Sequence, residues 1–318
     1  MHIAITIDTE EDNWGGYSEN SFGIENIRKI PSIQKVFDEF NIIPTYLVTY
    51  PVATSKDSVR ILNEILQQGK CEIGMHCHPW STPPFEEERD PHNSMLCNLP
   101  YDLQNKKMTL LHGVIERNFG IKAKAFRAGR FGFNGTVSRV IRDLGYTIDT
   151  SIVPFTDWSE SHGPDFSKMT PEVYRFTVPD ILKKRNDGEL IEIPLTIGYL
   201  QNNFKWCRTI ERYLSSRVVR KFRGIGILAA MKFLNKVQLS PEASDSTQMI
   251  ALTKVLKGKK LQILNMFFHS TSLLAGLSFL TNTKEDEIRF SKRLREYLKF
   301  TNEVGIKPIK FSQVKDII

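Results

Sequence analysis

A repeated pattern of hydrophobic and polar positions runs along most of the chain. Amphipathic stretches with apolar residues three or four positions apart end at a glycine, and a short apolar run follows each glycine. This spacing predicts helices, and a glycine just past a helix adopts the left-handed conformation that ends it. The helix–strand pairs are ILNEILQQG before KCEIGMH, LLHGVIERNFG before IKAKAF, VSRVIRDLG before YTIDTS, and REYLKFTNEVG before IKPIKF.

Four further apolar runs complete the set of predicted strands. They are HIAITID (2–8), IPTYLVT (43–49), LIEIPL (190–195) and KLQILNMFF (260–268). Strands that alternate with helices predict a parallel sheet with crossover helices. About seven to eight strands in one continuous alternation favour a single α/β barrel-like domain over residues 1–318 rather than two domains.

Two regions interrupt this alternation. Residues 79–101 form a proline-rich loop, and residues 200–240 read as a basic, mostly helical insertion within the domain. In barrel enzymes the loops that leave the C-terminal ends of the strands build the active site. The candidate functional residues are therefore those at predicted strand ends.

The composition is that of a soluble globular protein, with 41% hydrophobic and 25% charged residues. No stretch reaches about 18 apolar residues, so no membrane span is predicted. The N-terminus, MHIAITIDTEED, has no basic flank and no long apolar run, so it does not read as a secretion signal. The four cysteines show no C-x-x-C spacing and are interpreted as reduced thiols of a cytoplasmic protein.

The net charge of +7 comes from one segment. Residues 205–236 carry nine Lys/Arg and one Glu, which gives +8, and the rest of the chain carries 34 bases and 35 acids, which gives −1. A solvated basic helix is the plain interpretation of this segment. The sharper one is a peripheral contact with the anionic lipid at the inner face of a membrane. No nucleic-acid recognition motif is present, so nucleic-acid binding is not expected.

Two predicted strand ends carry groups that bind metals. The first strand ends in Asp8-Thr9-Glu10, and the third ends in His76-Cys77-His78. Residues two apart on a strand face the same way, so each pair projects together. Taken alone, the first motif is typical of a solvated acidic turn and the second of two surface histidines.

Both pairs, however, belong to the C-terminal rim of the same alternating fold. One carboxylate and two histidines give three protein ligands and leave a position for water, which is typical of a catalytic metal site. The other carboxylate is then available as a general base.

Three more predicted strand ends supply polar side chains to this rim. FRAGR places Arg127 and Arg130 there, and its glycine-containing turn could offer a backbone N–H to an oxyanion. MFFHS ends the long apolar strand with His269, a candidate general acid, and Asp149 in YTIDTS could orient it. Solvated arginines and a structural histidine are the plainer interpretations.

The proline-rich loop carries aromatic residues beside the histidine pair. Trp80, Phe85 and Tyr101 could stack on a sugar ring, or could serve only to pack the loop itself.

The order D-x-E, G-x-H-x-H-P, R-A-G-R, D-T-S, F-H-S resembles the polysaccharide deacetylases with NodB homology, carbohydrate esterase family 4. The resemblance runs from Asp8 to about Gly305 and is weakest over residues 200–240. It is strongest to the branch associated with cell-surface polysaccharide and lipopolysaccharide biosynthesis. It implies a distorted (β/α)-barrel and removal of acetyl from an N-acetyl sugar with one divalent metal ion, zinc being the first expectation.

The resemblance also implies roles for individual residues. Asp8 matches the base, Arg127 the arginine that holds the base, and the Arg130 amide the oxyanion donor. His76 and His78 match the metal histidines, Asp149 the acid behind the catalytic histidine, and His269 that histidine.

The sequence departs from the commoner pattern of this family at the metal ligands. That pattern has two adjacent aspartates, but Thr9 stands at the second position here. The strand period moves the carboxylate ligand to Glu10, with Glu11 as the alternative. The two histidines are two residues apart rather than four.

Other functions remain open at this stage. One is a metal-dependent amidohydrolase of the same fold that acts on a small non-sugar amide. Another is a relative that binds a glycan or lipid without catalysis, although binding alone does not need this combination of base, ligands, arginine and histidine.

Overall fold

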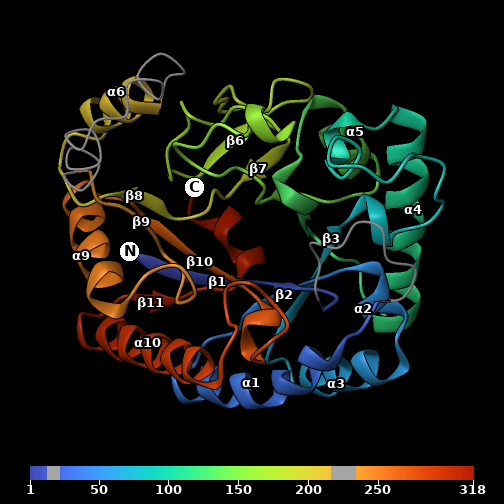
Figure 1. Cartoon of the computed structure of the whole chain (residues 1–318), viewed down its shortest axis with the longest axis horizontal. Helices are drawn as coiled ribbons and strands as arrows, with labels where there is room; N and C mark the ends of the chain where they lie inside the picture. The colour runs from blue at the N-terminus through green and yellow to red at the C-terminus, as the bar shows by residue number, and fades with distance from the viewer. Residues whose placement is uncertain (13–21, 216–233) are drawn as a thin grey trace.

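The computed structural model describes residues 1–12, 22–215 and 234–318. Figure 1 shows strands in the middle of the molecule and helices around them. The strands are β1 (His2–Thr9), β2 (Thr45–Val48), β3 (Glu72–Cys77), β4 (Ala125–Ala128), β5 (Ile148–Asp149), β6 (Tyr174–Phe176), β7 (Leu190–Glu192), β8 (Ile197–Tyr199), β9 (Lys236–Gln238), β10 (Ile263–His269) and β11 (Lys307–Pro308).

The helices lie mostly on the outside of the curled sheet (Figure 1). They are α1 (Ile30–Glu39), α2 (Tyr50–Thr54), α3 (Lys56–Gln67), α4 (Tyr101–Phe119), α5 (Gly135–Asp143), α6 (Phe204–Ser215), α9 (Ser246–Gly258) and α10 (Lys284–Glu303). Short 3₁₀ segments include η2 (Pro79–Ser81), η4 (Gly129–Phe131), η6 (Ser270–Leu273) and η7 (Phe311–Asp316). None of the helices described is both long and apolar enough to span a bilayer.

The predicted α/β barrel-like fold is confirmed. The main sheet has the order β10-β1-β2-β3-β4-β5-β7-β6. The short strand β11 pairs with the first residues of β1, on the side opposite β10. All its pairings are parallel except that of β6 with β7. The four predicted helix-ending glycines, Gly69, Gly120, Gly145 and Gly305, all have the positive φ that this position requires.

The ring is closed by irregular backbone rather than by a strand pair, which explains the distortion of the barrel. The Thr196 amide donates to the Asn265 carbonyl on β10, and the Leu239 amide donates to the Thr196 carbonyl. β8 and β9 form a separate antiparallel pair beside this seam. The seam was not predicted, because its hydrogen bonds follow no repeating pattern of side chains.

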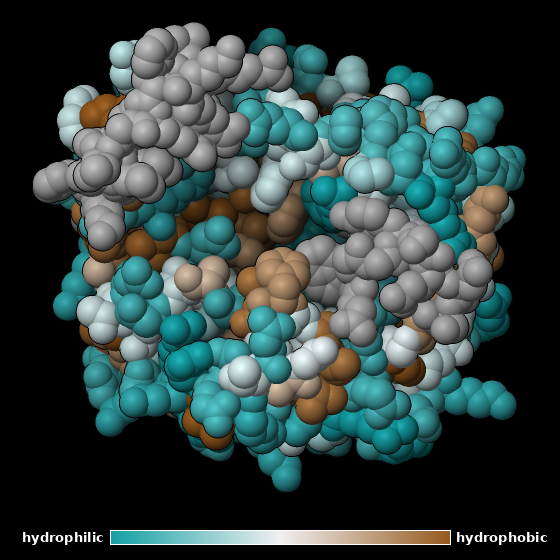
Figure 2. Space-filling model, viewed as in Figure 1, coloured by the Kyte–Doolittle hydropathy of each residue, from teal (hydrophilic) through white to brown (hydrophobic). Residues whose placement is uncertain are grey.

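Side chains that alternate along the strands fill the barrel in layers. The lowest layer is apolar and is closed by η7, whose Phe311 and Val314 are buried against it. The middle layer is polar, with Thr6 donating to the Asn265 amide oxygen at 3.0 Å. Two residues further along β1 comes Asp8, so the third layer, at the C-terminal rim, is the charged one. Figure 2 shows that the face seen in Figure 1 is hollowed near its middle.

The basic segment is described only in part. Residues 204–215 form helix α6 and residues 236–238 form β9. Residues 216–233, which carry much of the predicted basic insertion, lie outside the described residues.

Candidate metal centre and active site

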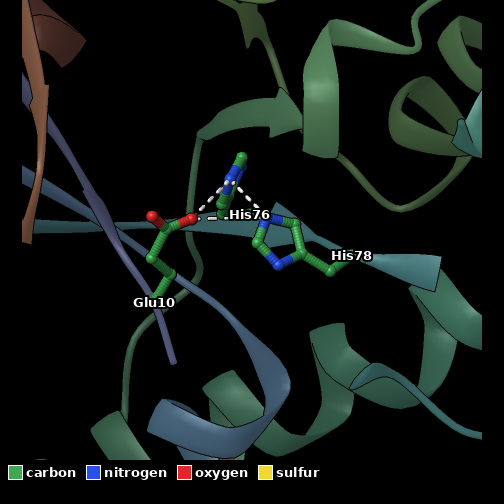
Figure 3. Close-up of side chains that lie close together, drawn as sticks. All are labelled: Glu10, His76 and His78. Carbon is green, nitrogen blue, oxygen red and sulfur yellow. Dashed lines mark hydrogen bonds and ion pairs between the residues drawn. The ribbon is translucent and has the colours of Figure 1, made fainter. Parts of the chain in front are cut away.

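Glu10, His76 and His78 come together at the rim of the barrel. Each offers one ligand atom, and these atoms lie within 4.8 Å of one another. The two histidines project from the end of β3 and meet the Glu10 carboxylate, which follows β1 (Figure 3). The Nε2 atoms of the two histidines are 3.0 Å apart, and Glu10 Oε2 lies 3.7 Å from His76 Nε2 and 3.4 Å from His78 Nε2.

The other ring nitrogens are already occupied. His76 Nδ1 lies 3.0 Å from the Arg127 carbonyl, and His78 Nδ1 lies 2.9 Å from Glu11 Oε1. A carbonyl and a carboxylate both accept hydrogen bonds, so each Nδ1 carries the proton and each Nε2 presents a lone pair. Two Nε2 lone pairs and the Glu10 carboxyl group then face one another.

A cation would resolve this arrangement, and the residues present fit one. Glu10 Oε1 is buried and has no hydrogen-bond partner among the described residues. Burial raises the pKa of Glu10 well above its ordinary value; His269 opposes this shift, and the nearby carboxylates add to it. Burial lowers the pKa of His76 to about 3. Three buried N and O ligands are the usual protein share of a catalytic zinc site.

The backbone around Glu10 is fixed from two sides. Its amide donates to Ser270 Oγ at 3.1 Å, and its carbonyl accepts from Asn26 Nδ2 at 3.0 Å. Glu11 lies behind His78, on Nδ1, rather than at the ligand position. The geometry therefore favours Glu10 over Glu11 as the ligand.

Asp8 lies beside the candidate metal centre and is held by Arg127. Arg127 Nη1 donates to Asp8 Oδ1 at 2.5 Å, and both side chains are buried. Arg127 also donates to Thr6 Oγ1 and to the Thr150 carbonyl, so the guanidinium is fixed by the polar layer below. Burial alone would raise the pKa of Asp8, but Arg127 and two histidines outweigh it and hold that pKa at about 2.

His269 lies across the site from the candidate metal ligands. Its Nε2 is 3.8 Å from Asp8 Oδ2, and its Nδ1 is 2.7 Å from Glu242 Oε1. Burial alone would lower the pKa of His269, but Glu242 and the carboxylates of Glu10 and Asp8 raise it to about 10. Glu242 also accepts from the His269 amide and from Ser272 Oγ, so it is fixed in place.

The prediction that Asp149 orients His269 is wrong. Asp149 shares its hydrogen bonds with Ser151 and Glu192, and its neighbour in register on β4 is Phe126, which belongs to the core outside the sheet. Side chains alternate along β5, so Asp149 points away from the barrel interior in which His269 lies. Glu242, which lies in a segment without a recognisable pattern, takes the place behind His269.

Arg130 belongs to a strained turn at the rim. Arg130 and Phe131 have φ of 50° and 61°, the left-handed region that only a few non-glycine residues adopt. A side chain at Gly129 would place its Cβ 2.5 Å from His78 Cδ2, so only glycine allows this approach to the histidine pair. The Arg130 guanidinium bonds to Ser94 Oγ and to the Pro91 carbonyl, which ties the turn to the proline-rich loop.

These groups share a cavity of about 260 Å³. Its aromatic lining consists of Phe131, Trp158 and Phe279, and the Phe131 and Trp158 rings stack at 6.0 Å between centroids. None of these three was predicted from the sequence. The complete lining is Asp8, Glu10, His76, His78, Met95, Arg130, Phe131, Trp158, His269 and Phe279.

The three aromatic residues that were predicted to bind a sugar lie elsewhere. Trp80 is buried and stacks on His78, with 4.1 Å between ring centroids, so it supports a candidate ligand. Phe85 contacts Arg89 and Lys107, and Tyr101 lies near Arg139. All three are outside the lining of this cavity.

Known structures share this fold. The chain aligns over its full length, at 15% identity and a TM-score of 0.57, with 89% of a protein of Mycobacterium smegmatis assigned as a polysaccharide deacetylase. It aligns over 99% of its length, at 11% identity and a TM-score of 0.63, with 70% of a protein of Parabacteroides distasonis assigned as a glycoside hydrolase/deacetylase. A branching enzyme of Thermococcus kodakaraensis matches at 10% identity and a TM-score of 0.53, over 99% of this chain and 70% of that one.

No protein-family model and no curated protein matches the sequence. At these identities the structural matches establish the distorted barrel seen in polysaccharide deacetylases and in glycoside hydrolases.

Proposed function

We propose that this protein is a metal-dependent hydrolase that removes the acetyl group from an N-acetylated sugar, releasing acetate and an amino sugar. The observation that carries the proposal is one cavity in which a Glu/His/His cluster, an arginine-held aspartate and a carboxylate-held histidine face one another. The fold shared with proteins assigned as polysaccharide deacetylases supports it.

Glu10, His76 and His78 would hold the metal ion. When bound, a divalent ion such as zinc supplies Lewis acidity, which polarises a carbonyl and makes water more acidic. Glu11 and the Arg127 carbonyl keep the two imidazoles in the tautomer and orientation that this role requires.

Asp8 is the proposed general base. Its Oδ1 is engaged by Arg127, which leaves Oδ2 facing His76 and His269 across the cavity. Oδ2 is therefore placed to take a proton from the water that attacks the acetyl carbon. Arg127 fixes the orientation of this carboxylate. A base that is already oriented reduces the entropic part of the activation barrier.

His269 is the proposed general acid. The amine formed when the C–N bond breaks is a poor leaving group unless it receives a proton. Glu242 holds Nδ1, so Nε2 faces the cavity and can deliver that proton. The Arg130 amide, in its left-handed turn, is proposed to donate a hydrogen bond to the carbonyl oxygen as negative charge develops on it.

Phe131 and Trp158 form the proposed wall for the sugar ring. Their stacked rings line the same cavity as the candidate catalytic groups. Sugars present C–H groups on their faces, and these pack well on aromatic rings. The wall is therefore suited to a sugar ring.

Elemental analysis of the purified protein tests the metal centre. We expect about one divalent transition-metal ion per chain in the wild type and its loss in His76→Ala/His78→Ala. His92→Ala/His162→Ala is the matched control, because those two rings also lie near each other, at 5.5 Å between centroids, but on the surface. That control should keep the metal.

Acetate release from a panel of N-acetyl sugars tests the reaction. Asp8→Asn should keep the metal and lose turnover, and Trp158→Ala should mainly raise KM. No metal in the wild type after reconstitution, or full turnover in Asp8→Asn, would refute the proposal.

A further inference from the structure

Helix α6 has two faces of different character. Its inner face packs on the domain: Cys207 is fully buried, and the Phe204 ring lies 5.6 Å from the Phe155 ring and 5.7 Å from the Tyr199 ring. Glu211 accepts a hydrogen bond from the Tyr199 hydroxyl and forms an ion pair with Lys236 at 3.3 Å. These contacts fix the rotation of α6 about its axis.

The outer face combines aromatic and basic side chains. Trp206 is 55% exposed and Tyr213 is 68% exposed, and seven residues, or two turns, separate them, so they share one stripe of the helix. Lys205 and Arg212 are also exposed and lie along one side of this stripe, and Arg212 also borders a groove lined by Asp157 and Asp165. The one acidic residue of α6, Glu211, lies on the inner face, so the exposed face has no carboxylate.

We propose that this face of α6 docks on the surface of an anionic lipid bilayer. Tryptophan and tyrosine favour the boundary between headgroups and acyl chains, because their rings are apolar and their N–H and O–H groups remain solvated. Basic side chains beside them are attracted by anionic headgroups. A protein partner would need shape complementarity, whereas a bilayer requires only this pairing of aromatic and basic groups.

Charge complementarity supports a lipid surface as the occupant. In the sequence, the stretch 205–236, which begins with α6, carries +8 and the rest of the chain −1. Within α6 itself three basic residues stand against one acidic residue. A bilayer with anionic lipid attracts such a local excess at a distance of about 8–10 Å at ordinary ionic strength. Figure 1 shows α6 at the periphery, beyond β8 and β9.

The start of α6 contacts the segment that leads to the wall of the proposed active-site cavity. The Phe204 ring lies 5.6 Å from the Phe155 ring, and Phe155 lies three residues before Trp158, which lines that cavity. Docking through α6 would therefore hold the cavity near the lipid surface. This last step rests on the proposed function, but the docking itself does not.

Sedimentation with lipid vesicles tests the inference. The full chain is mixed with vesicles of phosphatidylcholine alone and of phosphatidylcholine with 30–40% phosphatidylglycerol, about the range at which surface potentials are substantial. We expect binding to the anionic vesicles only, weakened by salt, and a blue shift of tryptophan emission that Trp206→Phe removes. Lys205→Glu/Arg212→Glu should lower the affinity at least about thirtyfold, and Trp206→Ser/Tyr213→Ser at least about tenfold.

Matched variants on another helix give the control. Lys292→Glu/Lys299→Glu makes the same change in net charge on α10, where these side chains are 72% and 75% exposed, and Ile288→Ser removes an apolar side chain that is 60% exposed. These variants should bind like the wild type. Circular dichroism melting shows that each variant is folded.

The inference is overturned if the wild type does not bind, if it binds phosphatidylcholine equally well, or if the α6 and α10 variants lose affinity alike. The assay needs no metal and no turnover. Its failure would therefore leave the proposed deacetylase activity standing, and a failure to release acetate would leave vesicle binding standing.

Discussion

Three carboxylates near the end of β1 have different neighbours because their side chains point in different directions. Asp8 points into the barrel and meets Arg127, Glu10 points into it one step higher and meets the two histidines, and Glu11 points the other way and reaches His78 from behind. The alternation of a strand is enough to separate these positions. One short acidic stretch therefore supplies the proposed base, a candidate ligand and the partner of another candidate ligand.

Glu11→Gln should weaken the candidate metal site without abolishing it. The substitution replaces the carboxylate that holds His78 Nδ1 and so loosens the ring and makes it less basic. Such partners usually contribute about 10–100-fold to metal affinity. A competition titration with a chromogenic chelator measures the change, and Glu10→Gln should show the larger loss. Equal affinities in Glu11→Gln and the wild type would mean that His78 is not a ligand.

Glu242→Gln should separate catalysis from metal binding. Glu242 contacts His269 and not the Glu/His/His cluster, so metal affinity should stay within about twofold of the wild type. Turnover should fall by about 10²–10⁴, the usual contribution of a proton-transfer group. Acetate release under saturating substrate measures this. A variant that loses metal together with activity would place Glu242 in the metal site instead.

The sequence identified the residues of the site that end regular strands and missed those that do not. Asp8, His76, Arg127 and His269 each follow an apolar run, so strand ends and alternation brought them to one rim. Asp149 also ends such a run, but side chains alternate along β5, and the Asp149 side chain points to the outer side of the sheet. Glu242 and Trp158 lie in segments without periodicity, so only the folded chain places them.

At the scale of elements, the turn after β3 depends on one lysine of α4. Lys107 Nζ is buried and donates to the carbonyls of Pro79, Thr82 and Pro84, and it pairs with Glu87 at 2.8 Å. A protonated amine thus satisfies a loop that has no regular hydrogen bonding. That loop follows His78, and its Trp80 ring stacks on the His78 ring. Lys107 therefore fixes the surroundings of a candidate ligand.

Lys107→Met should destabilise the fold by about 3–5 kcal/mol, because it leaves the Glu87 carboxylate buried without its cation. Lys106→Met is the matched control: Lys106 also pairs with a glutamate, Glu86, but the two side chains are 53% and 50% exposed. That pair should contribute at most about 1 kcal/mol. Urea unfolding gives both free energies, and similar losses for the two variants would contradict the structural role assigned to Lys107.

The difference between periodic and irregular segments also explains which elements could be predicted. Helices that end at a glycine, and the strands that follow them, can be recognised from local periodicity. The pairs α3–β3 and α5–β5 are found where expected. The seam between Thr196 and Asn265 and the antiparallel strands β6, β8 and β9 are short and irregular. Their positions follow from closing the ring, which is a property of the whole chain.

At the scale of the whole molecule, the barrel separates charge by layer and by side. The interior runs from an apolar floor to a charged rim, whereas the outward side chains of the described strands are mostly apolar. On the neighbouring strands β5 and β7, however, Asp149 and Glu192 lie in register and are both fully buried. In the described part of the chain Glu192 Oε2 has no hydrogen-bond donor while both groups are ionised, so one of the two carboxyls must be protonated to donate to the other.

This pair should make stability depend on pH. Burial, and then the charge of its partner, raises the pKa of Glu192 well above its ordinary value, and burial raises that of Asp149. Above the unfolded pKa of about 4.3, the folded chain holds a proton that the unfolded chain has released. Stability from this proton is therefore complete at low pH and falls as the pH rises towards the folded pKa, by at most about 1.4 kcal/mol per pH unit.

Glu192→Gln removes that dependence, because the amide donates to Asp149 without needing a proton. The free energy of unfolding of Glu192→Gln minus that of the wild type should therefore increase as the pH is raised from 5 to 9, by at most about 1.4 kcal/mol per unit. Glu189→Gln is the control, because Glu189 directly precedes β7 and its side chain is 42% exposed. Its free energy of unfolding minus that of the wild type should not change over the same pH range. Parallel curves for Glu192→Gln and the wild type would show that the two carboxyls do not share a proton, and that the outer face of the sheet tolerates both charges.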